Sequence, residues 1–344
     1  MSPRRSVTLQ DVADAAGVSR SAASFALTNR GRLSDATRER VQEAARSLGY
    51  RPNAAAQSLR SARTGVVAVH VPEDTLTLGY YMEATFGIVD EASTAGTLVT
   101  FVPRGADDDP LSRLRADGII VLDPTLDDPV LQRLIETGIP IVTGEPMPEG
   151  LPPGQGEVRS DHAATTRTLL DHFEARGARA PAIISLDLHE SWSEDIKRAY
   201  VDWCAAHGLR ERIEVVPLAG VEERTTEATR ALLDPSDPAD AIIALTDGSV
   251  LSVVTSAVEF GRVVGDDLLV AAAVDSPVLG YTDPAITAVD LHAREFGREC
   301  MRVMRQVLDS GTRVPSAARA SSGPRFRRLV PTEVVFRAST AGRR

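Results

Sequence analysis

The sequence contains little cysteine, few aromatic residues and no long apolar run. Its 344 residues include two cysteines, Cys204 and Cys300, and both lie in segments whose patterns indicate helices. Two thiols in such places exclude a disulfide framework and predict buried, reduced side chains. The longest apolar stretches, such as 241–245 and 268–274, are far shorter than the roughly 20 residues that cross a bilayer. We therefore expect no membrane partner.

Patterns for catalysis, metal binding and secretion are also missing. The six histidines are scattered, and no His-x-x-x-His, Cys-x-x-Cys, P-loop or Gly-x-Ser-x-Gly spacing occurs. The clustered acids at 107–109 and 266–267 favour solvated loops or helix caps over a divalent-ion site. The sequence thus predicts neither an enzyme nor a metal or cofactor protein. The N-terminus lacks the apolar segment of a secretory signal, so we expect a cytoplasmic protein.

What the chain does have is a segregation of charge. With 43% hydrophobic and 25% charged residues it has a globular composition, and its length suggests two or three domains. Residues 1–65 hold 11 arginines and 5 acids, a net charge of +6, whereas the other 279 residues hold 27 bases and 43 acids, a net charge of −16. A small basic module on an acidic body suggests that the first 65 residues bind a polyanion.

The basic segment has the pattern of three short helices around one small core. Thr8, three residues before Asp11, predicts a capped helix start, and Gly17 predicts the end of that helix. Ser19 can cap a second helix that runs to about residue 28. A third helix is expected between residue 34 or 35 and Gly49. Helix, tight turn and helix in this order predict a DNA-reading helix-turn-helix.

In such a unit the N-terminal residues of the second helix lie nearest the base edges. Here these residues are Ser19, Arg20, Ser21 and Ser24. Arg20 is the leading candidate for direct readout, because its guanidinium can donate two hydrogen bonds to guanine. Residues 53–60 follow as an alanine-rich helical segment of two turns, which is too short to be stable alone and can fold on binding.

The stretches VTLQDVADAAGVSRSAASFALTN and TRERVQEAARSLGYRPNAAAQSLRSARTGVVAV resemble the N-terminus of the LacI/GalR family of bacterial transcriptional repressors. The resemblance implies that 53–60 is a hinge helix, which pairs with its dimer mate in the minor groove. It places Leu59 as the wedge between base pairs and Ala56 as the small residue that permits close helix approach. The alternative for Leu59 is a packing role between head and body.

The resemblance also draws attention to Phe25, which stands where many family members carry an arginine or histidine directed at a base. Phenylalanine can contact a thymine methyl or join the core, but it cannot donate to guanine. Asn29 is a candidate phosphate contact. The full set of candidate DNA-binding residues is Thr8, Ser19, Arg20, Ser21, Ser24, Phe25, Asn29, Tyr50, Asn53, Ala56 and Leu59.

From residue 66 onward, short apolar runs alternate with helical patterns. Four strands are expected before a Pro/Gly-rich break at 145–156, and five after it. These nine strands are 65–71, 98–102, 118–122, 139–143, 180–186, 213–218, 241–245, 268–274 and 285–290. Strands separated by helices predict parallel βαβ units. The predicted fold is therefore an all-α helix-turn-helix head and an α/β body of two doubly wound parallel-sheet lobes.

The family resemblance continues more loosely through the body, in GYYMEATFGI, VRSDHAATTRTLLDHFEARGARAPAII and LVPTEVVFRAST. It implies a periplasmic-binding-protein-like body in which the chain crosses between lobes near Asp161, Asp290 and 323–326. The expected divisions are 1–51 for the DNA-binding head, 52–64 for the hinge helix and linker, and 65–344 for the effector-binding and dimerisation body. Within the body, the N-lobe comprises about 65–160 and 292–323, and the C-lobe about 161–291 and 324–340.

The resemblance implies an effector cleft between the lobes, yet several sugar-binding groups are missing. Ile196, Ala199 and Leu291 stand where sugar-binding relatives carry an arginine, a glycine and a polar residue. Because unpaired hydroxyls are costly to bury, this pattern argues against a simple sugar effector. The candidate cleft residues are Tyr80, Tyr81, Asp161, Trp192, Asp247 and Asp275, whose aromatic rings and carboxylates suit an amphipathic or cationic ligand. The alternative is that the tyrosines pack the lobe and Asp275 caps a helix.

We therefore expect a homodimeric, sequence-specific transcriptional regulator, either a repressor or a dual regulator. Two heads would read an inverted-repeat operator in double-stranded DNA, and a small molecule in the cleft would change the affinity for it. Two alternatives stay open: a DNA-binding regulator that has lost small-molecule control, and a solute-binding protein with the same body. The basic head and the missing secretory signal argue against the second.

Overall fold

The computed structural model describes residues 7–27, 33–50, 63–71, 79–102, 111, 114–187, 191–217, 220–311 and 323–342. The chain divides into two compact units, a head of residues Met1–Thr64 and a body of residues Gly65–Arg344, and each is treated by itself. Four residues predicted to contact DNA, and the hinge segment to which three of them belong, lie outside the described residues. These four are Asn29, Asn53, Ala56 and Leu59.

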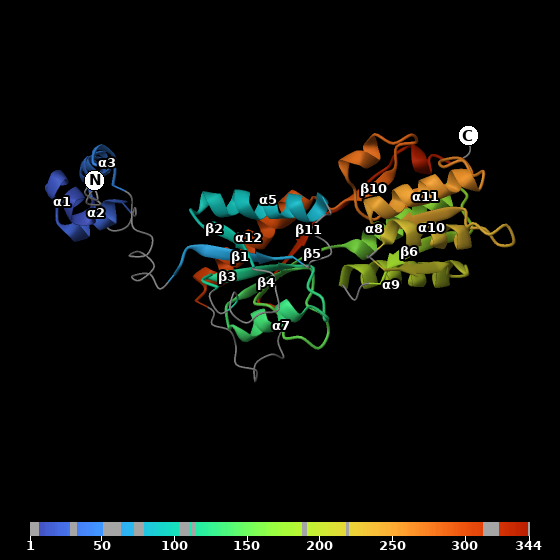
Figure 1. Ribbon diagram of the computed structural model, residues 1–344, viewed down its shortest axis with the longest axis horizontal. Helices are drawn as coiled ribbons and strands as arrows, with labels where there is room; N and C mark the ends of the chain where they lie inside the picture. Colours follow the sequence, from blue (N-terminus) through green and yellow to red (C-terminus); the bar gives the residue numbers. More distant parts are fainter. Residues whose placement is uncertain are drawn as a thin grey trace. The chain divides into compact units, whose positions relative to one another are not determined.

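The head contains the three predicted helices, α1 (Leu9–Ala16), α2 (Arg20–Leu27) and α3 (Asp35–Ser47) (Figure 1). Small apolar side chains such as Val12, Ala23 and Val41 are buried where the three helices meet. The guanidinium of Arg40 on α3 donates to the backbone carbonyl of Ala16 at 3.1 Å, which ties α3 to the end of α1. Short side chains allow these short helices to pack closely, and this packing stabilises helices that would be marginal alone.

The first lobe of the body is a parallel six-stranded sheet in the order β11-β5-β4-β3-β1-β2. Its strands are β1 (Val66–His70), β2 (Leu98–Phe101), β3 (Gly118–Leu122), β4 (Ile141–Gly144), β5 (Gly156–Ser160) and β11 (Phe326–Val330). Figure 1 shows α5 (Gly79–Thr94) and α12 (Ala293–Asp309) over one face and α7 (Pro129–Glu136) over the other. Alternate residues of β1 serve the two faces, because Val67 and Val69 pack with α5 and α12 whereas Ala68 packs with α7.

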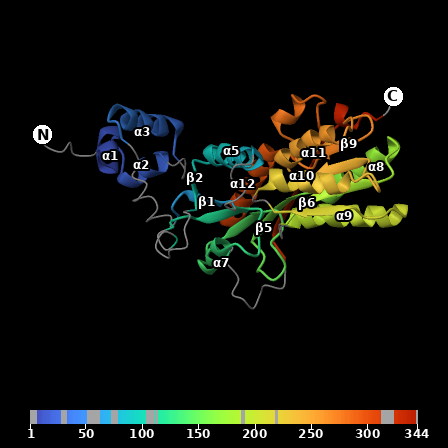
Figure 2. The same cartoon turned by 45° about the vertical axis from the view of Figure 1, so that its right-hand side comes forward.

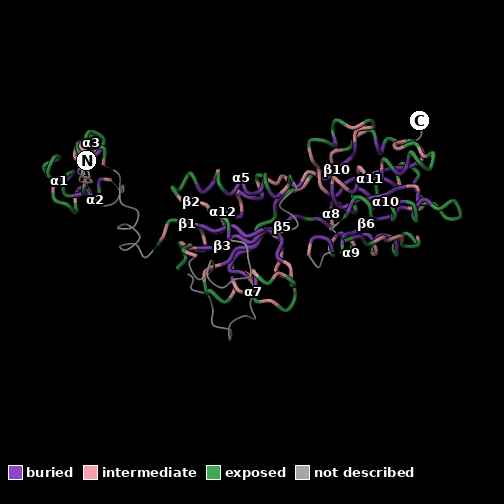
Figure 3. The backbone as a smooth tube through the Cα atoms, in the orientation of Figure 1, coloured by how far each residue is buried: buried purple, intermediate pink, exposed green. Residues whose placement is uncertain are grey.

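The second lobe is a six-stranded sheet in the order β12-β10-β9-β8-β6-β7, in which β12 alone is antiparallel to its neighbour. Its strands are β6 (Pro181–Leu186), β7 (Ile213–Val216), β8 (Ala241–Ala244), β9 (Leu269–Ala272), β10 (Thr287–Asp290) and β12 (Glu333–Val335). Its helices are α8 (His162–Ala175), α9 (Ser191–His207), α10 (Val221–Leu232), α11 (Asp247–Glu259) and the 3-10 turns η2 (Pro277–Gly280) and η4 (Ala338–Thr340). Figure 2 shows α9 and α11 on opposite sides of this sheet, and Figure 3 shows that its central strands are buried.

The chain crosses between the lobes three times, and the structure moves one of the predicted crossings. The first crossing follows β5 at Asp161, and the second follows β10 at residues 291–292. The third was predicted at 323–326 and is wrong, because β11 pairs with β5 in the first sheet and β12 pairs with β10 in the second. The chain therefore crosses at residues 331–332, and 326–330 belong to the first lobe.

Helices α5 and α12 approach so closely that each carries a glycine at the contact. A methyl group on Gly297 would overlap the backbone carbonyl of Ala84, and one on Gly87 would overlap that of Arg294. Around this contact Arg294 and Arg298 of α12 form ion pairs with Asp90 of α5, at 2.9 and 3.0 Å. The close approach holds α12, which follows the second crossing, firmly against the first lobe.

Replacing Gly297 with alanine is expected to lower the free energy of unfolding by about 1–3 kcal/mol, since the added methyl forces the two helix backbones apart. Chemical unfolding monitored by circular dichroism measures the loss. The matched control is Gly248→Ala in α11 (Asp247–Glu259), where the added methyl meets only the flexible end of Glu222 at 3.6 Å. Equal free energies of unfolding for the two variants would show that α5 and α12 can move apart without loss of stability.

Both cysteines lie in helices, Cys204 in α9 and Cys300 in α12, and both are free, buried thiols as predicted. Burial raises the pKa of each thiol, and that of Cys300 is raised well above its usual range. Over the part of the chain that the structure describes, no helix is both long and apolar enough to span a membrane.

Candidate functional site

The turn between α1 and α2 is fixed by local hydrogen bonds. The backbone N–H of Thr8 donates to the carboxylate of Asp11 at 2.7 Å, while the N–H of Asp11 donates back to the Thr8 hydroxyl at 3.3 Å. Gly17 ends α1 in the left-handed conformation with φ 63°, and the hydroxyl of Ser19 accepts from the N–H of Ala22 at 3.2 Å to begin α2. These caps confirm the predicted helix limits and commit the Thr8 side chain to the start of α1.

Helix α2 presents a polar face with one large ring. Ser19, Arg20 and Ser21 are exposed, whereas Ala23 and Ala26 are buried in the head core. Phe25 is 47% exposed and so does not join that core. Because residues four apart share a helix face, Ser21 and Phe25 lie side by side on the outer surface of α2.

The other predicted DNA-binding residues that the structure describes are less exposed. Ser24 is half-buried on α2, and Tyr50 packs against the head core after α3. Asn29, Asn53, Ala56 and Leu59 were predicted in segments outside the described residues, so their predicted roles stay predictions. The described candidate surface is therefore the outer face of α2, with Arg20 and Phe25 as its largest side chains.

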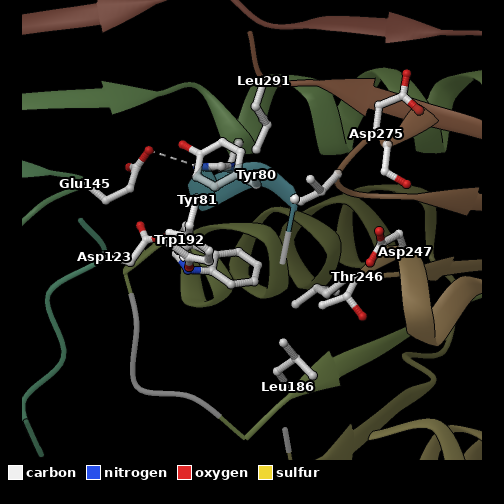
Figure 4. A pocket seen from close by; sticks show the side chains of 15 residues that line it. Tyr80, Tyr81, Asp123, Glu145, Leu186, Trp192, Thr246, Asp247, Asp275 and Leu291 are labelled. Carbon is white, nitrogen blue, oxygen red and sulfur yellow. Dashed lines mark hydrogen bonds and ion pairs between the residues drawn. The ribbon is translucent and has the colours of Figure 1, made fainter. Parts of the chain in front are cut away.

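The body contains a cavity between its two lobes, at the carboxyl ends of strands in both sheets (Figure 4). Five of the six predicted cleft residues line it: Tyr80, Tyr81, Trp192, Asp247 and Asp275. Further lining residues are Gly79, Asp123, Glu145, His162, Leu186, Leu245, Thr246, Val274, Ser276 and Leu291. Ligand sites in open α/β sheets lie at this edge, because successive strands end there in loops.

Asp161 is the predicted cleft residue that the structure places elsewhere. It is the N-cap of α8, and its carboxylate accepts from the backbone N–H of Ala164 at 2.9 Å. Asp161 does not line the cavity. A helix start needs an acceptor for its free N–H groups, and this need directs the side chain to the first turn of α8.

The aromatic residues form one wall of the cavity. Tyr81 is buried, and its hydroxyl donates to Asp123 at 2.5 Å. The ring of Tyr80 packs edge-on against that of Tyr81 with centroids 5.3 Å apart, and the ring of Trp192 lies 6.2 Å from that of His162. Burial raises the pKa of Tyr80 well above its usual range, and the carboxylates of Asp123 and Glu145 raise it further. The tyrosines thus pack the lobe and face the cavity at the same time.

Two carboxylates of the cavity were not predicted, Asp123 after β3 and Glu145 after β4. Asp123 and Glu145 are 5% and 2% exposed, respectively. The backbone N–H of Ser160 donates to Glu145 Oε1 at 3.0 Å, and His162 Nε2 lies 3.2 Å from the same oxygen. A signal was available in the sequence, because Asp123 directly follows the predicted strand 118–122, Glu145 follows the predicted strand 139–143 after one glycine, and the carboxyl ends of parallel strands meet at one edge.

Asp275 does not cap a helix, in contrast to the alternative that the sequence left open. Both of its carboxylate oxygens accept from the guanidinium of Arg337, at 2.9 and 2.6 Å. Arg337 also donates to the backbone carbonyl of Ile286 at 2.6 Å. Asp247 begins α11, and its carboxylate accepts from the N–H of Gly248 at 2.8 Å. The charge of Asp275 is therefore balanced within the protein.

Comparison with known proteins identifies both units. Residues 8–53 match the family described as "Bacterial regulatory proteins, lacI family", and residues 170–340 match the "Periplasmic binding protein-like domain". The chain is 30% identical over 315 residues to the HTH-type transcriptional regulator CelR of Thermobifida fusca, covering 88% of this chain and 92% of that protein. The chain belongs to the LacI family of bacterial regulatory proteins. It is a DNA-binding transcriptional regulator with an effector-binding domain.

Further similar proteins also match over most of the chain. Catabolite control protein A of Staphylococcus xylosus is 26% identical over 316 residues, covering 88% of this chain and 93% of that protein. A solved CelR–cellobiose complex is 26% identical with a TM-score of 0.69, over 97% of this chain and 99% of that chain. The lac repressor dimer bound to operator and the anti-inducer ONPF, at 22% identity and a TM-score of 0.74 over 98% of this chain and 99% of that chain, shares the fold.

The LacI-family relatives named above are transcriptional regulators, which agrees with the expectation that this chain is not an enzyme. Within the described ranges, no group of three or more His, Cys, Asp or Glu side chains is placed to hold a metal ion. The two sites are suited to binding rather than to catalysis: one is a helix face that can enter a groove, and the other is a cavity lined by aromatic rings and carboxylates.

Proposed function

We propose that this LacI-family regulator binds a specific inverted-repeat operator as a homodimer in the cytoplasm, and that a small molecule in the cleft changes its affinity for that operator. The observation that carries the DNA-binding part is the outer face of α2. Arg20, Ser21 and Phe25 are exposed there, while the opposite side of the helix fills the head core. A helix with one such free face fits the major groove, where Arg20 can bond to guanine and Phe25 can contact a thymine methyl.

Apolar side chains on the body support the homodimer. Met82, Phe86 and Val89 follow one face of α5 at helical spacing, and each is exposed. Beside them a groove at the lobe junction is lined by Met82 and by Pro277 of η2, and Tyr281, directly after η2, is 90% exposed. We name this face, with Met82, Phe86, Val89, Val278 and Tyr281, the α5 face and propose that a second copy covers it.

The construction of the body supports control by a ligand. The cavity is lined from both lobes, and the lobes are joined by three crossings, so a ligand that contacts both sides favours a closed arrangement. The first crossing lies at Asp161, immediately after β5. Binding energy at the cavity can change the relation of the lobes and thereby the operator affinity, through a coupling of about 1–3 kcal/mol.

The experiment that tests this proposal is selection of binding sites from random double-stranded DNA with the purified full chain. We expect enrichment of a single inverted repeat, protected in footprinting over both half-sites. Affinity measured by fluorescence anisotropy should fall steeply with salt, because arginines displace counterions from phosphates. Recovery of DNA without any shared sequence would contradict a sequence-specific operator.

Replacing Arg20 with alanine is expected to weaken binding to the selected operator by about 1–3 kcal/mol, or roughly 5- to 150-fold, with much less effect on random DNA. The loss is selective because the two hydrogen bonds to guanine depend on sequence. Anisotropy titrations on both DNAs give the ratio. Arg46→Ala is the matched control, because Arg46 is an exposed arginine of the head that pairs with Glu43 on α3. An equal loss on operator and random DNA would reduce Arg20 to a phosphate contact.

A further inference from the structure

The deep end of the cavity is built from two acids in a costly backbone conformation. Asp123 has φ 45° and Glu145 has φ 75°, and among the described non-glycine residues only His292 shares this region, with φ 49°. Such conformations cost on the order of 1–3 kcal/mol each and persist where the surroundings hold them in place. Here they turn two carboxylates, rather than two neutral groups, into the cavity between the lobes.

One oxygen of this pair has no hydrogen-bond partner. Oε1 of Glu145 meets Ser160 and His162, whereas Oε2 is buried and accepts no hydrogen bond from any described residue. The Glu145 residue as a whole is 2% exposed. A buried acceptor that stays unsatisfied is unfavourable, and more so when it belongs to a charged group. The site therefore lacks a donor, preferably a cationic one.

The remaining lining strengthens the negative character. Asp123, Glu145, Asp247 and Asp275 line the cavity, and no lysine or arginine appears among the described lining residues. Arg337 pairs with Asp275, the Tyr81 hydroxyl donates to Asp123, and His162 lies 3.2 Å from Glu145 Oε1, so the oxygen that still needs a donor is Glu145 Oε2. Burial raises the pKa of Cys300, and the nearby Glu145 and Asp123 carboxylates raise it further, as they do for Tyr80. The two carboxylates thus lie close enough to both groups to disfavour further negative charge at this end of the cavity.

The rings supply the complementary surface for a cation. Figure 4 shows Glu145 and Asp123 at one end of the cavity and Asp247 and Asp275 at the other. The rings of Tyr80, Tyr81 and Trp192 lie between these two pairs of acids. Electron-rich ring faces attract cations, and they also cover a carbon skeleton. A polyol site commonly adds planar bidentate donors to its acceptors, and no arginine, asparagine or glutamine appears among the described lining residues.

We propose that the effector of this regulator is an organic cation, whose protonated amine binds Glu145 and Asp123 and whose carbon skeleton lies against the aromatic wall. This inference rests on the proposed function and names the chemical class of its ligand. The ammonium group supplies donors for the free Oε2 oxygen and balances buried negative charge. It also explains why two acids, and not arginines, close the deep end of the cavity.

The test uses the full chain and thermal unfolding with 1-aminobutane, 1,4-diaminobutane and choline as probes. The neutral 1,4-butanediol and cellobiose are the comparison compounds, all at matched ionic strength. We expect at least one amine to raise Tm by about 5 °C at saturating concentration, because only the folded cavity binds it, while the diol leaves Tm unchanged. No shift with any of the three amines, or an equal shift with the diol, would overturn the proposal.

A pair of variants locates the binding site. Glu145→Gln keeps an oxygen for Ser160 and removes the charge, so we expect an unliganded Tm at least as high as the wild type and an at least 10-fold weaker amine response. Glu157→Gln, a buried glutamate of β5 that does not line the cavity, should keep the full response. A full response in Glu145→Gln, or a large fall of its unliganded Tm, would overturn the assignment of Glu145.

The outcome for the cation is separable from the outcome for the proposed function. Operator binding without any added compound tests the regulator itself. If the operator is bound and cellobiose raises Tm while the amines do not, control by a ligand stands and the cationic class is wrong. If the amines raise Tm and no operator is selected, the cleft assignment stands and the proposal of a specific inverted-repeat operator is wrong.

Discussion

Replacing Tyr281 with aspartate is expected to convert the protein to monomers and to lower its operator affinity by at least about 100-fold. Tyr281 is 90% exposed in the single chain, so the substitution removes little packing within the protomer. At the proposed interface it would place an unpaired carboxylate in an apolar contact, which is strongly unfavourable. A monomer holds one half-site only, and the loss of the second head removes a gain of about 10²- to 10⁴-fold from bivalent binding.

Sedimentation velocity reports the mass and anisotropy reports the affinity of the Tyr281→Asp variant. The matched control is Val215→Asp, which introduces the same charge at an exposed apolar residue, 50% exposed, on the edge strand β7. We expect this control to stay dimeric and to bind the operator normally. A dimeric Tyr281→Asp protein, or a monomeric protein with undiminished affinity, would refute the α5 face as the functional interface.

Loss of the Arg337 side chain should cause the largest fall in stability. In Arg337→Leu the free energy of unfolding is expected to drop by about 3 kcal/mol, at the low end for buried ion pairs. The side chains of Asp275 and Arg337 are 17% and 19% exposed, so Asp275 keeps partial access to water once its partner is gone. The variant also loses the hydrogen bond from Arg337 to the carbonyl of Ile286.

Urea unfolding of the Arg337→Leu variant measures this loss. The double variant Asp275→Leu with Arg337→Leu removes the unpaired charge as well, and we expect it to recover at least half of the stability. Arg179→Leu breaks an exposed contact with Glu174 at 3.8 Å and should cost less than about 1 kcal/mol. Equal stability of the single and double variants would show that the buried charge of Asp275 is not the cause.

Most of the fold followed from patterns of a few neighbouring residues. The head helices begin and end at caps that the sequence displays, as Thr8 and Gly17 show. All nine predicted strands occur. They could be predicted because buried parallel strands are almost continuously apolar in sequence. Strand β5, Gly156–Ser160, was missed because Val158 is its only strongly apolar residue. Its pairing with β4 and β11 makes it a strand in spite of its polar composition.

The candidate sites divide in the same way. On α2 the exposed and buried residues follow from helical periodicity, so Arg20 and the serines could be predicted without a structure. In the cleft the prediction depended on family resemblance, and Asp161 proved to cap α8. Asp123 and Glu145 were missed because they are separated by 22 positions and by α7, and only adjacent strands bring them together.

The sequence by itself determined the alternation of strands and helices in the body, the helix limits in the head, the burial of both thiols and the segregation of basic and acidic charge. These properties depend on local caps, periodicity and composition, which neighbouring residues carry. Only the tertiary structure decided which sheet β11 joins, that Asp275 binds Arg337, and that Glu145 keeps a buried oxygen without a partner. Each of these depends on pairings between residues or strands far apart in the chain or on burial by several elements at once, and local patterns contain no information on them.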